Sequence, residues 1–200
     1  MRLHRPHAVL GLSLACFAAL AAAVVLAGDL PFDRAVRDAL LEAGPAATAV
    51  MRVANWGGEA RLLVPATLLL AIVVPRARQR WWLWLGLMVT APLAEGALKL
   101  LILRPRPEGT GLAFPSGHAT AAAAFFGAVF YLAGALSPGP RRALRALALA
   151  AIALVAAARV MLRAHWPSDV LAGVALGLAL AAAAALLDGR PAPSARSGPT

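Results

Sequence analysis

Residues 99–118 read KLLILRPRPEGTGLAFPSGH, and this stretch decides how the rest of the chain is interpreted. It holds a lysine, two arginines, a serine and a histidine between two long apolar segments. The Arg104-Pro105-Arg106-Pro107 segment ends the preceding helix, because proline lacks an N–H and pushes the residue before it toward extended backbone. The sequence therefore predicts a polar connection between two apolar helices.

Composition indicates a membrane protein. The chain has 200 residues, of which 61% are hydrophobic and only 14% are charged, whereas soluble domains carry about 25% charged residues. The net charge of +10 lies in short basic groups between apolar runs, as topology signals do. Because no basic domain is present, nucleic-acid binding is excluded. The single cysteine, Cys16, permits no intrachain disulfide.

Six apolar runs predict six membrane spans. The first run is uncharged for twenty residues, which is enough to cross a bilayer core. The alternative, a cleaved signal peptide, is disfavoured because the run exceeds the usual apolar core of about 7–15 residues. The second run is the weakest, since it is short and contains Pro65, and a re-entrant segment is its alternative. The six runs are 8–27, 62–74, 81–103, 119–136, 146–162 and 170–187.

The polar stretch 29–59 leaves the membrane between the first two spans. Phe32, Val36 and Leu40 recur at helical spacing, which predicts a short amphipathic helix at the membrane interface. Residues 55–58, NWGG, indicate a turn with an interfacial tryptophan. We therefore expect an all-α, integral membrane, six-transmembrane-helix bundle with a short amphipathic interfacial helix between spans 1 and 2. Residues 1–189 form its single domain, and 190–200 form a disordered cytoplasmic tail.

The distribution of charge predicts the orientation. The side that holds both termini has ten basic residues and one acid, whereas the opposite side has nine basic residues and eight acids. Because positive residues collect in the cytoplasm, both termini are expected there. The 99–118 and 159–169 stretches then both emerge on the outer side.

Residues 114–118, FPSGH, open the fourth span. Ser116 suits the N-cap position, which leaves free backbone N–H groups at a positive helix end, a common site for phosphate. Lys99 and Arg106 bring two further positive charges to the same interface, and the Arg106 fork can grip phosphate oxygens in bidentate fashion. The alternative is simple helix capping, with the cations extended toward the headgroups.

A second polar cluster, Arg159-Val-Met-Leu-Arg-Ala-His165-Trp-Pro-Ser-Asp169, precedes the sixth span. If this turn is helical, His165 and Asp169 share a face. A carboxylate on one imidazole nitrogen leaves the other nitrogen free to act as a nucleophile. The alternative is an interfacial His–Asp pair without a catalytic role.

Together the segments Lys99-x6-Arg106-Pro107, Pro115-Ser116-Gly117-His118 and Arg159-x5-His165-x3-Asp169 resemble the three-part signature of the type 2 phosphatidic acid phosphatase (PAP2) superfamily. One departure is Ala158, where the family usually has serine. The resemblance implies a phosphatase that needs no metal and no cofactor. It implies that His165 attacks phosphorus, that His118 is the acid and base, and that Asp169 orients His165. It also implies that the phosphoryl oxygens are held by Lys99, Arg106, Ser116, Gly117 and Arg159.

The resulting expectation is a lipid phosphatase of the cytoplasmic membrane with an outward-facing site. Undecaprenyl diphosphate is the first choice of substrate, and phosphatidylglycerophosphate or phosphatidate comes next. A lipid phosphotransferase, and a transporter or scaffold with an inactive site, are the alternatives. Glu95 is expected to pair with Lys99, four residues away, and Arg163 to be an interfacial cation. The sequence leaves the oligomeric state open.

Overall fold

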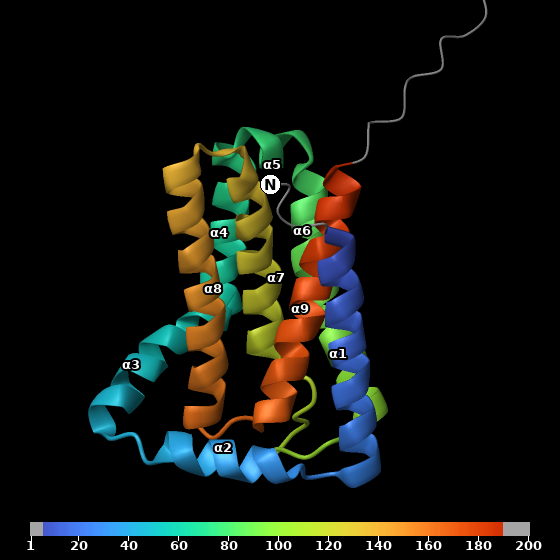
Figure 1. Ribbon diagram of the computed structural model, residues 1–200, viewed down its shortest axis with the longest axis vertical. Coiled ribbons are helices and arrows are strands. Elements are labelled where there is room, and N and C mark those ends of the chain that lie inside the picture. The colour runs from blue at the N-terminus through green and yellow to red at the C-terminus, as the bar shows by residue number, and fades with distance from the viewer. Residues whose placement is uncertain (1–5, 190–200) are drawn as a thin grey trace, which may run out of the picture.

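The computed structural model describes residues 6–189, and the expected tail at 190–200 lies outside them. The described residues are helical and contain no strand, only an isolated bridge between Pro105 and Leu112. The long helices run side by side as a bundle (Figure 1). In chain order the helices are α1 Pro6–Ala27, α2 Pro31–Leu41, α3 Pro45–Asn55, η1 Trp56–Gly58, α4 Ala60–Val73, α5 Pro75–Gln79, α6 Trp81–Ile102, α7 Gly117–Leu132, η2 Ala133–Ala135, α8 Pro138–Met161 and α9 Pro167–Asp188.

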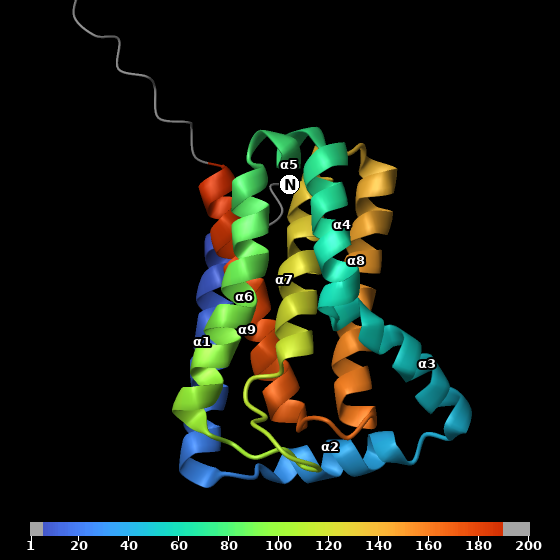
Figure 2. The same cartoon turned by 180° about the vertical axis from the view of Figure 1, so that it is seen from behind.

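The expected six-span membrane bundle is confirmed, with one span built differently from the others. Five of the described helices are long and apolar enough to cross a bilayer: α1, α6, α7 with η2, α8 and α9. The remaining span is the second in chain order, which was predicted as the weakest and is formed by α4. It is long enough to cross a bilayer only together with α3 and η1, as a pair of helices bent by 50°. Figure 2 shows α3 slanting away from the bundle below α4.

Three segments outside the six predicted spans are also helical. Much of the polar stretch before span 2 forms α3, the basic segment between spans 2 and 3 forms α5, and the basic segment before span 5 is the first part of α8. Each of these helices begins at a proline: Pro45, Pro75 and Pro138. Proline favours the first helical position, because its missing N–H has no partner there in any case. These three prolines therefore start helices and do not break them.

The α7–α9 pair forms the centre of the bundle, with α1 against α9 and α8 against α7. Two glycines of α9 allow the close contact. A methyl group at Gly173 would lie 2.5 Å from the Ser116 carbonyl oxygen, and one at Gly177 would lie 2.4 Å from that of Thr120. Small residues of this kind let two helix backbones approach directly, so the start of α7 is held tightly against the start of α9.

Helix α2 lies across one end of the bundle, beneath α8 and α9 (Figure 1). Its Phe32 and Val36 side chains are exposed, as expected for an amphipathic helix at a membrane interface. Asp33 instead points into the bundle and is fully buried. The first turn of α1 and the last turn of α9 lie at the opposite end (Figure 2).

Candidate active site

The second and third sequence motifs meet at the α2 end of the bundle. The Ser116 backbone N–H donates a hydrogen bond of 2.9 Å to the Asp169 carbonyl oxygen. Ala119, Val160 and Val170, each next to a predicted site residue, form one buried apolar cluster. The starts of α7 and α9 and the end of α8 are therefore fixed against one another.

The predicted acid–base residue, His118, lies in the first turn of α7 and packs against η1. A Cβ at Gly58 would lie only 2.7 Å from the His118 Cβ, so the turn touches the histidine directly. The same turn holds the third-motif arginine, because Arg159 Nη1 donates to the Asn55 side-chain oxygen at 2.6 Å. Asn55 in turn donates to Glu59 at 3.0 Å. The turn at 55–59, whose role we had not predicted, thus connects His118 to Arg159.

His165 and Asp169 face each other across the start of α9. His165 Nδ1 lies 3.8 Å from Asp169 Oδ2, which is longer than a hydrogen bond, although hydrogen bonds of catalytic groups commonly tighten only when substrate is bound. His165 precedes the helix, since Trp166 is the N-cap. The two residues therefore do not share a helical face, whereas a helical turn would have placed them on one. The Trp166 backbone N–H donates to Asp169 Oδ2 at 2.9 Å and fixes that carboxylate.

The environment of His165 favours the neutral imidazole. The side chain is buried, and its backbone N–H donates to the Arg159 carbonyl oxygen at 3.2 Å. Burial lowers the pKa of His165 below its ordinary value of 6.5, Asp169 raises it in part, and the Arg159 and Arg106 charges lower it further. A neutral imidazole with an acid on its Nδ1 side has a free Nε2 lone pair, as a nucleophile requires.

The predicted phosphate-binding cations lie near the two histidines, since Arg159 and Arg106 interact electrostatically with both of them and Lys99 with His118. Lys99 Nζ lies 2.5 Å from Glu95 Oε1, which confirms the expected pair. That carboxylate would lie 2.9 Å from a Cβ at Gly117, so Lys99 reaches the start of α7. Arg159 is 9% exposed, and its Nε has no hydrogen-bond partner within residues 6–189. Arg106 is held through its Nε by the Leu112 carbonyl oxygen at 3.4 Å.

Ser116 occupies the N-cap position of α7, but its side chain makes no capping hydrogen bond. Its hydroxyl is fully buried and has no partner in the described part of the chain. A buried hydroxyl without a partner is costly. The predicted N-cap position is confirmed, the alternative of simple side-chain capping is not seen, and the Ser116 hydroxyl remains available to a bound oxyanion beside the backbone N–H groups at the start of α7.

Arg104, which we did not predict as a site residue, is the most completely paired cation in this region. Its Nη1 donates to Asp169 Oδ1 at 2.7 Å and to Ser168 Oγ at 2.6 Å. Its Nη2 donates to Asp33 Oδ2 at 2.8 Å. The sequence signal was the first arginine of the Arg-Pro-Arg-Pro segment, which we interpreted only as the end of a helix.

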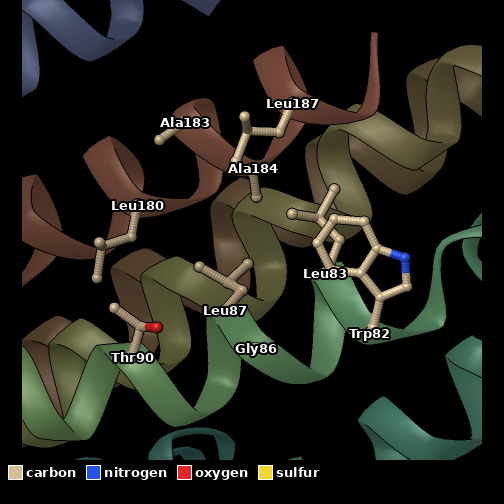
Figure 3. A pocket seen from close by; sticks show the side chains of 9 residues that line it. All are labelled: Trp82, Leu83, Gly86, Leu87, Thr90, Leu180, Ala183, Ala184 and Leu187. Atoms are coloured by element: carbon tan, nitrogen blue, oxygen red, sulfur yellow. The ribbon is translucent and has the colours of Figure 1, made fainter. Parts of the chain in front are cut away.

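An apolar groove elsewhere in the bundle does not belong to this site. Figure 3 shows an apolar groove between α6 and α9, lined by Trp82, Leu87, Leu180 and their neighbours, with Thr90 as its polar residue. Its lining residues belong to the first half of α6 and the last half of α9, whereas His118 and His165 lie at the start of α7 and just before α9. Among residues 6–189, no three His, Cys, Asp or Glu side chains form a group that could hold a metal ion.

Comparisons with known proteins agree with this geometry. The model of the PAP2 superfamily matches residues 80–190. The chain is 30% identical over 166 residues to decaprenylphosphoryl-5-phosphoribose phosphatase of Mycobacterium tuberculosis, covering 78% of this chain and 88% of that protein. Its fold is similar to the crystal structure of a transmembrane PAP2-type phosphatidylglycerolphosphate phosphatase from Bacillus subtilis. The TM-score is 0.79 at 26% identity, over 93% of this chain and 96% of that one. The protein is therefore a multi-span membrane phosphatase of the PAP2 superfamily.

Proposed function

We propose that the protein hydrolyses a phosphate group carried by a membrane lipid, through a phosphohistidine on His165. The observation that carries this proposal is the meeting of His118, His165 and Asp169 with Lys99, Arg106 and Arg159 at one end of an apolar bundle. Helix α2, with its exposed apolar face, lies at the same end. A lipid in a bilayer presents its phosphate at the membrane surface, where the interfacial helix α2 lies, with its chains along the side of the bundle.

In the proposed reaction, His165 Nε2 attacks phosphorus while the phosphate–lipid P–O bond breaks. His118 donates its proton to the leaving lipid oxygen, which releases the alcohol, or the lipid phosphate if the substrate is a diphosphate. His118 then takes a proton from water, whose oxygen attacks the phosphohistidine, so that inorganic phosphate leaves and His165 is restored. Asp169 orients His165 and stabilises the imidazolium character that develops on it.

The remaining groups bind the phosphoryl oxygens. Lys99, Arg106 and Arg159 supply positive charge, while the Ser116 hydroxyl and the Gly117 backbone N–H supply donors at the start of α7. Negative charge on these oxygens grows in the transition state, and donors fixed in advance stabilise it most effectively. These roles use only side chains and backbone groups of the chain, so we expect activity without a bound metal.

The charge distribution supports a location in the cytoplasmic membrane with both termini inside and the site outside. Two relatives have names that specify a phosphate on a polyprenyl-linked sugar and on phosphatidylglycerol. We therefore propose a polyprenyl-linked or glycerol-linked lipid phosphate as substrate class, with undecaprenyl diphosphate as the diphosphate to be tested beside them.

The test is phosphate release by purified protein from a panel of these lipids in mixed micelles. Wild-type protein should release phosphate from at least one of them, and His165→Ala should release none. Transfer of the phosphoryl group to a second lipid, with no free phosphate, would identify a phosphotransferase and refute hydrolysis. Wild-type protein that processes no lipid phosphate would support an inactive scaffold or transporter.

A further inference from the structure

The Arg104 guanidinium lies between two carboxylates at the boundary of α2, α6 and α9. Nη1 donates to Asp169 Oδ1 at 2.7 Å, and Nη2 donates to Asp33 Oδ2 at 2.8 Å. Both acids are fully buried, and the Arg104 side chain is 5% exposed. Charges so far from water are stable only when they are paired and hydrogen-bonded, so these three side chains form one unit.

Ser168 completes this unit and attaches α2 to α9. Its backbone N–H donates to Asp33 Oδ1 at 2.7 Å, and its hydroxyl donates to Asp33 Oδ2 at 2.7 Å. The same hydroxyl oxygen accepts from Arg104 Nη1 at 2.6 Å. Both oxygens of Asp33 are therefore occupied. Arg104 cannot rotate away from Asp169 without also losing its hydrogen bonds to Ser168 and Asp33.

The carboxylate of Asp169 is consequently fixed on two sides. Arg104 holds Oδ1, and the Trp166 backbone N–H holds Oδ2, the oxygen that faces His165. Both terminal nitrogens of Arg104 are engaged with protein oxygens, and its Nε is buried without a hydrogen-bond partner in the described residues. The contact through which Arg104 most directly reaches the site is therefore its hydrogen bond to Asp169.

We propose that Arg104, anchored by Asp33 of the interfacial helix α2, is a positioning residue that holds the Asp169 carboxylate in register with His165. This inference depends on the proposed phosphohistidine chemistry. It adds to the support of the site Asp33, which lies outside the recognised motifs, and Ser168, which lies within the third motif without an assigned role. It also gives α2 a role in the reaction beyond lying at the membrane surface.

The first test is steady-state kinetics of Arg104→Met. Because a misplacement of about 1 Å in a catalytic group costs about 10²-fold, kcat should fall by roughly that factor. KM should change less than about threefold, since both terminal nitrogens of the guanidinium are engaged with protein oxygens. Arg104→Lys should recover only part of the rate, because an ammonium cannot bridge two carboxylates as a planar fork does.

The matched control is Arg76→Met. Arg76 also pairs with a buried carboxylate of α9, through a 2.6 Å contact to Asp188, but at the opposite end of the helix. It should retain wild-type kcat. If Arg104→Met does not fold, the double variant Asp33→Asn/Arg104→Met decides, because it removes one positive and one negative charge together. This variant should show the same loss of kcat, and a normal kcat in it would overturn the proposal.

A double-mutant cycle separates positioning from general structural support. Once Asp169→Asn has removed the acid, Arg104 has no carboxylate of the site left to position. Adding Arg104→Met to Asp169→Asn should then lower kcat by less than about threefold, as expected for residues that act as one unit. Multiplicative losses would show that Arg104 acts independently of Asp169 and would overturn the proposal.

The outcomes also separate this inference from the proposed function. Wild-type protein that turns over no lipid phosphate contradicts the proposed function, whatever the variants do. Active wild-type protein, a dead His165→Ala variant and a fully active Arg104→Met variant together contradict the positioning role alone. A raised KM with unchanged kcat in Arg104→Met would assign Arg104 to substrate binding instead, and would equally overturn the inference.

Discussion

Gly58→Ala is the substitution whose effect follows most directly from the structure. Gly58 ends η1 and packs on the first turn of α7. A Cβ added there would lie 2.7 Å from the His118 Cβ and 2.8 Å from the His118 carbonyl oxygen. Both neighbours belong to the backbone or its first side-chain carbon, so no rotamer change relieves the contact. Either α7 moves at His118 or η1 retreats with Asn55 and its hydrogen bond to Arg159.

The size of the displacement sets the expected loss. Nonbonded carbon atoms lie about 3.5–4.0 Å apart at their optimum, so the groups must separate by about 1 Å. A displacement of this size in a catalytic group costs about 10²-fold in rate, which corresponds to about 2.7 kcal/mol of transition-state stabilisation. We therefore expect kcat/KM of Gly58→Ala to be about a hundredth of the wild-type value.

The assay is phosphate release by purified protein from its best lipid substrate, with thermal unfolding measured on the same samples. The control is Gly86→Ala in α6, where an added Cβ would meet nothing within 4 Å. The control should keep wild-type activity. If the kcat/KM of a folded Gly58→Ala protein is within about twofold of that of Gly86→Ala, catalysis does not require His118 to be placed as precisely as we infer.

Three further predictions concern the chemistry of the site. In a single turnover, before water is needed, His118→Ala should slow the release of nitrophenolate from a nitrophenyl phosphate much less than the release of the leaving group from a lipid phosphate, because nitrophenolate leaves without a proton; equal losses in this step would contradict an acid role. Burial keeps His165 neutral in the folded state, so the unfolded chain binds more protons below pH 6.5, and stability should fall as pH drops through this value. Unfolding temperatures measured between pH 7.5 and 5 should therefore decrease less in His165→Gln, and identical slopes would contradict this assignment. Activity should persist in EDTA and be inhibited by vanadate, a phosphoryl mimic; loss of activity in EDTA would indicate a required metal.

The apolar runs predicted the bundle because a bilayer requires about twenty apolar residues per span, and that requirement is visible locally. The helices that were missed, α3, α5 and the first turns of α8, lie in polar segments, where no such requirement applies. There the prolines could be interpreted as breaks or as first helical residues. Packing against the rest of the bundle decides between these states, and local sequence does not contain that information.

The motif residues were predicted to lie together because their types and spacing carry the chemistry. The residues that support them were not predicted, because they contact the site residues from distant parts of the sequence. Asp33 reaches Arg104 across 71 positions, and Asn55 reaches Arg159 across 104. An isolated Asp33 on an amphipathic helix is indistinguishable from its solvated neighbours. A partial signal was available in Arg104, since an arginine at the end of an apolar span must find a partner.

The most direct test of the central claim is to identify the residue that carries phosphate during turnover. Protein quenched during reaction with a lipid labelled at its terminal phosphate should retain label, and mass spectrometry under neutral conditions should locate it on His165. With a labelled nitrophenyl phosphate, whose leaving group needs no acid, the label should accumulate in His118→Ala, in which water is not activated, and be absent from His165→Ala. Label on any other residue, or an active enzyme that never carries label, would contradict the account.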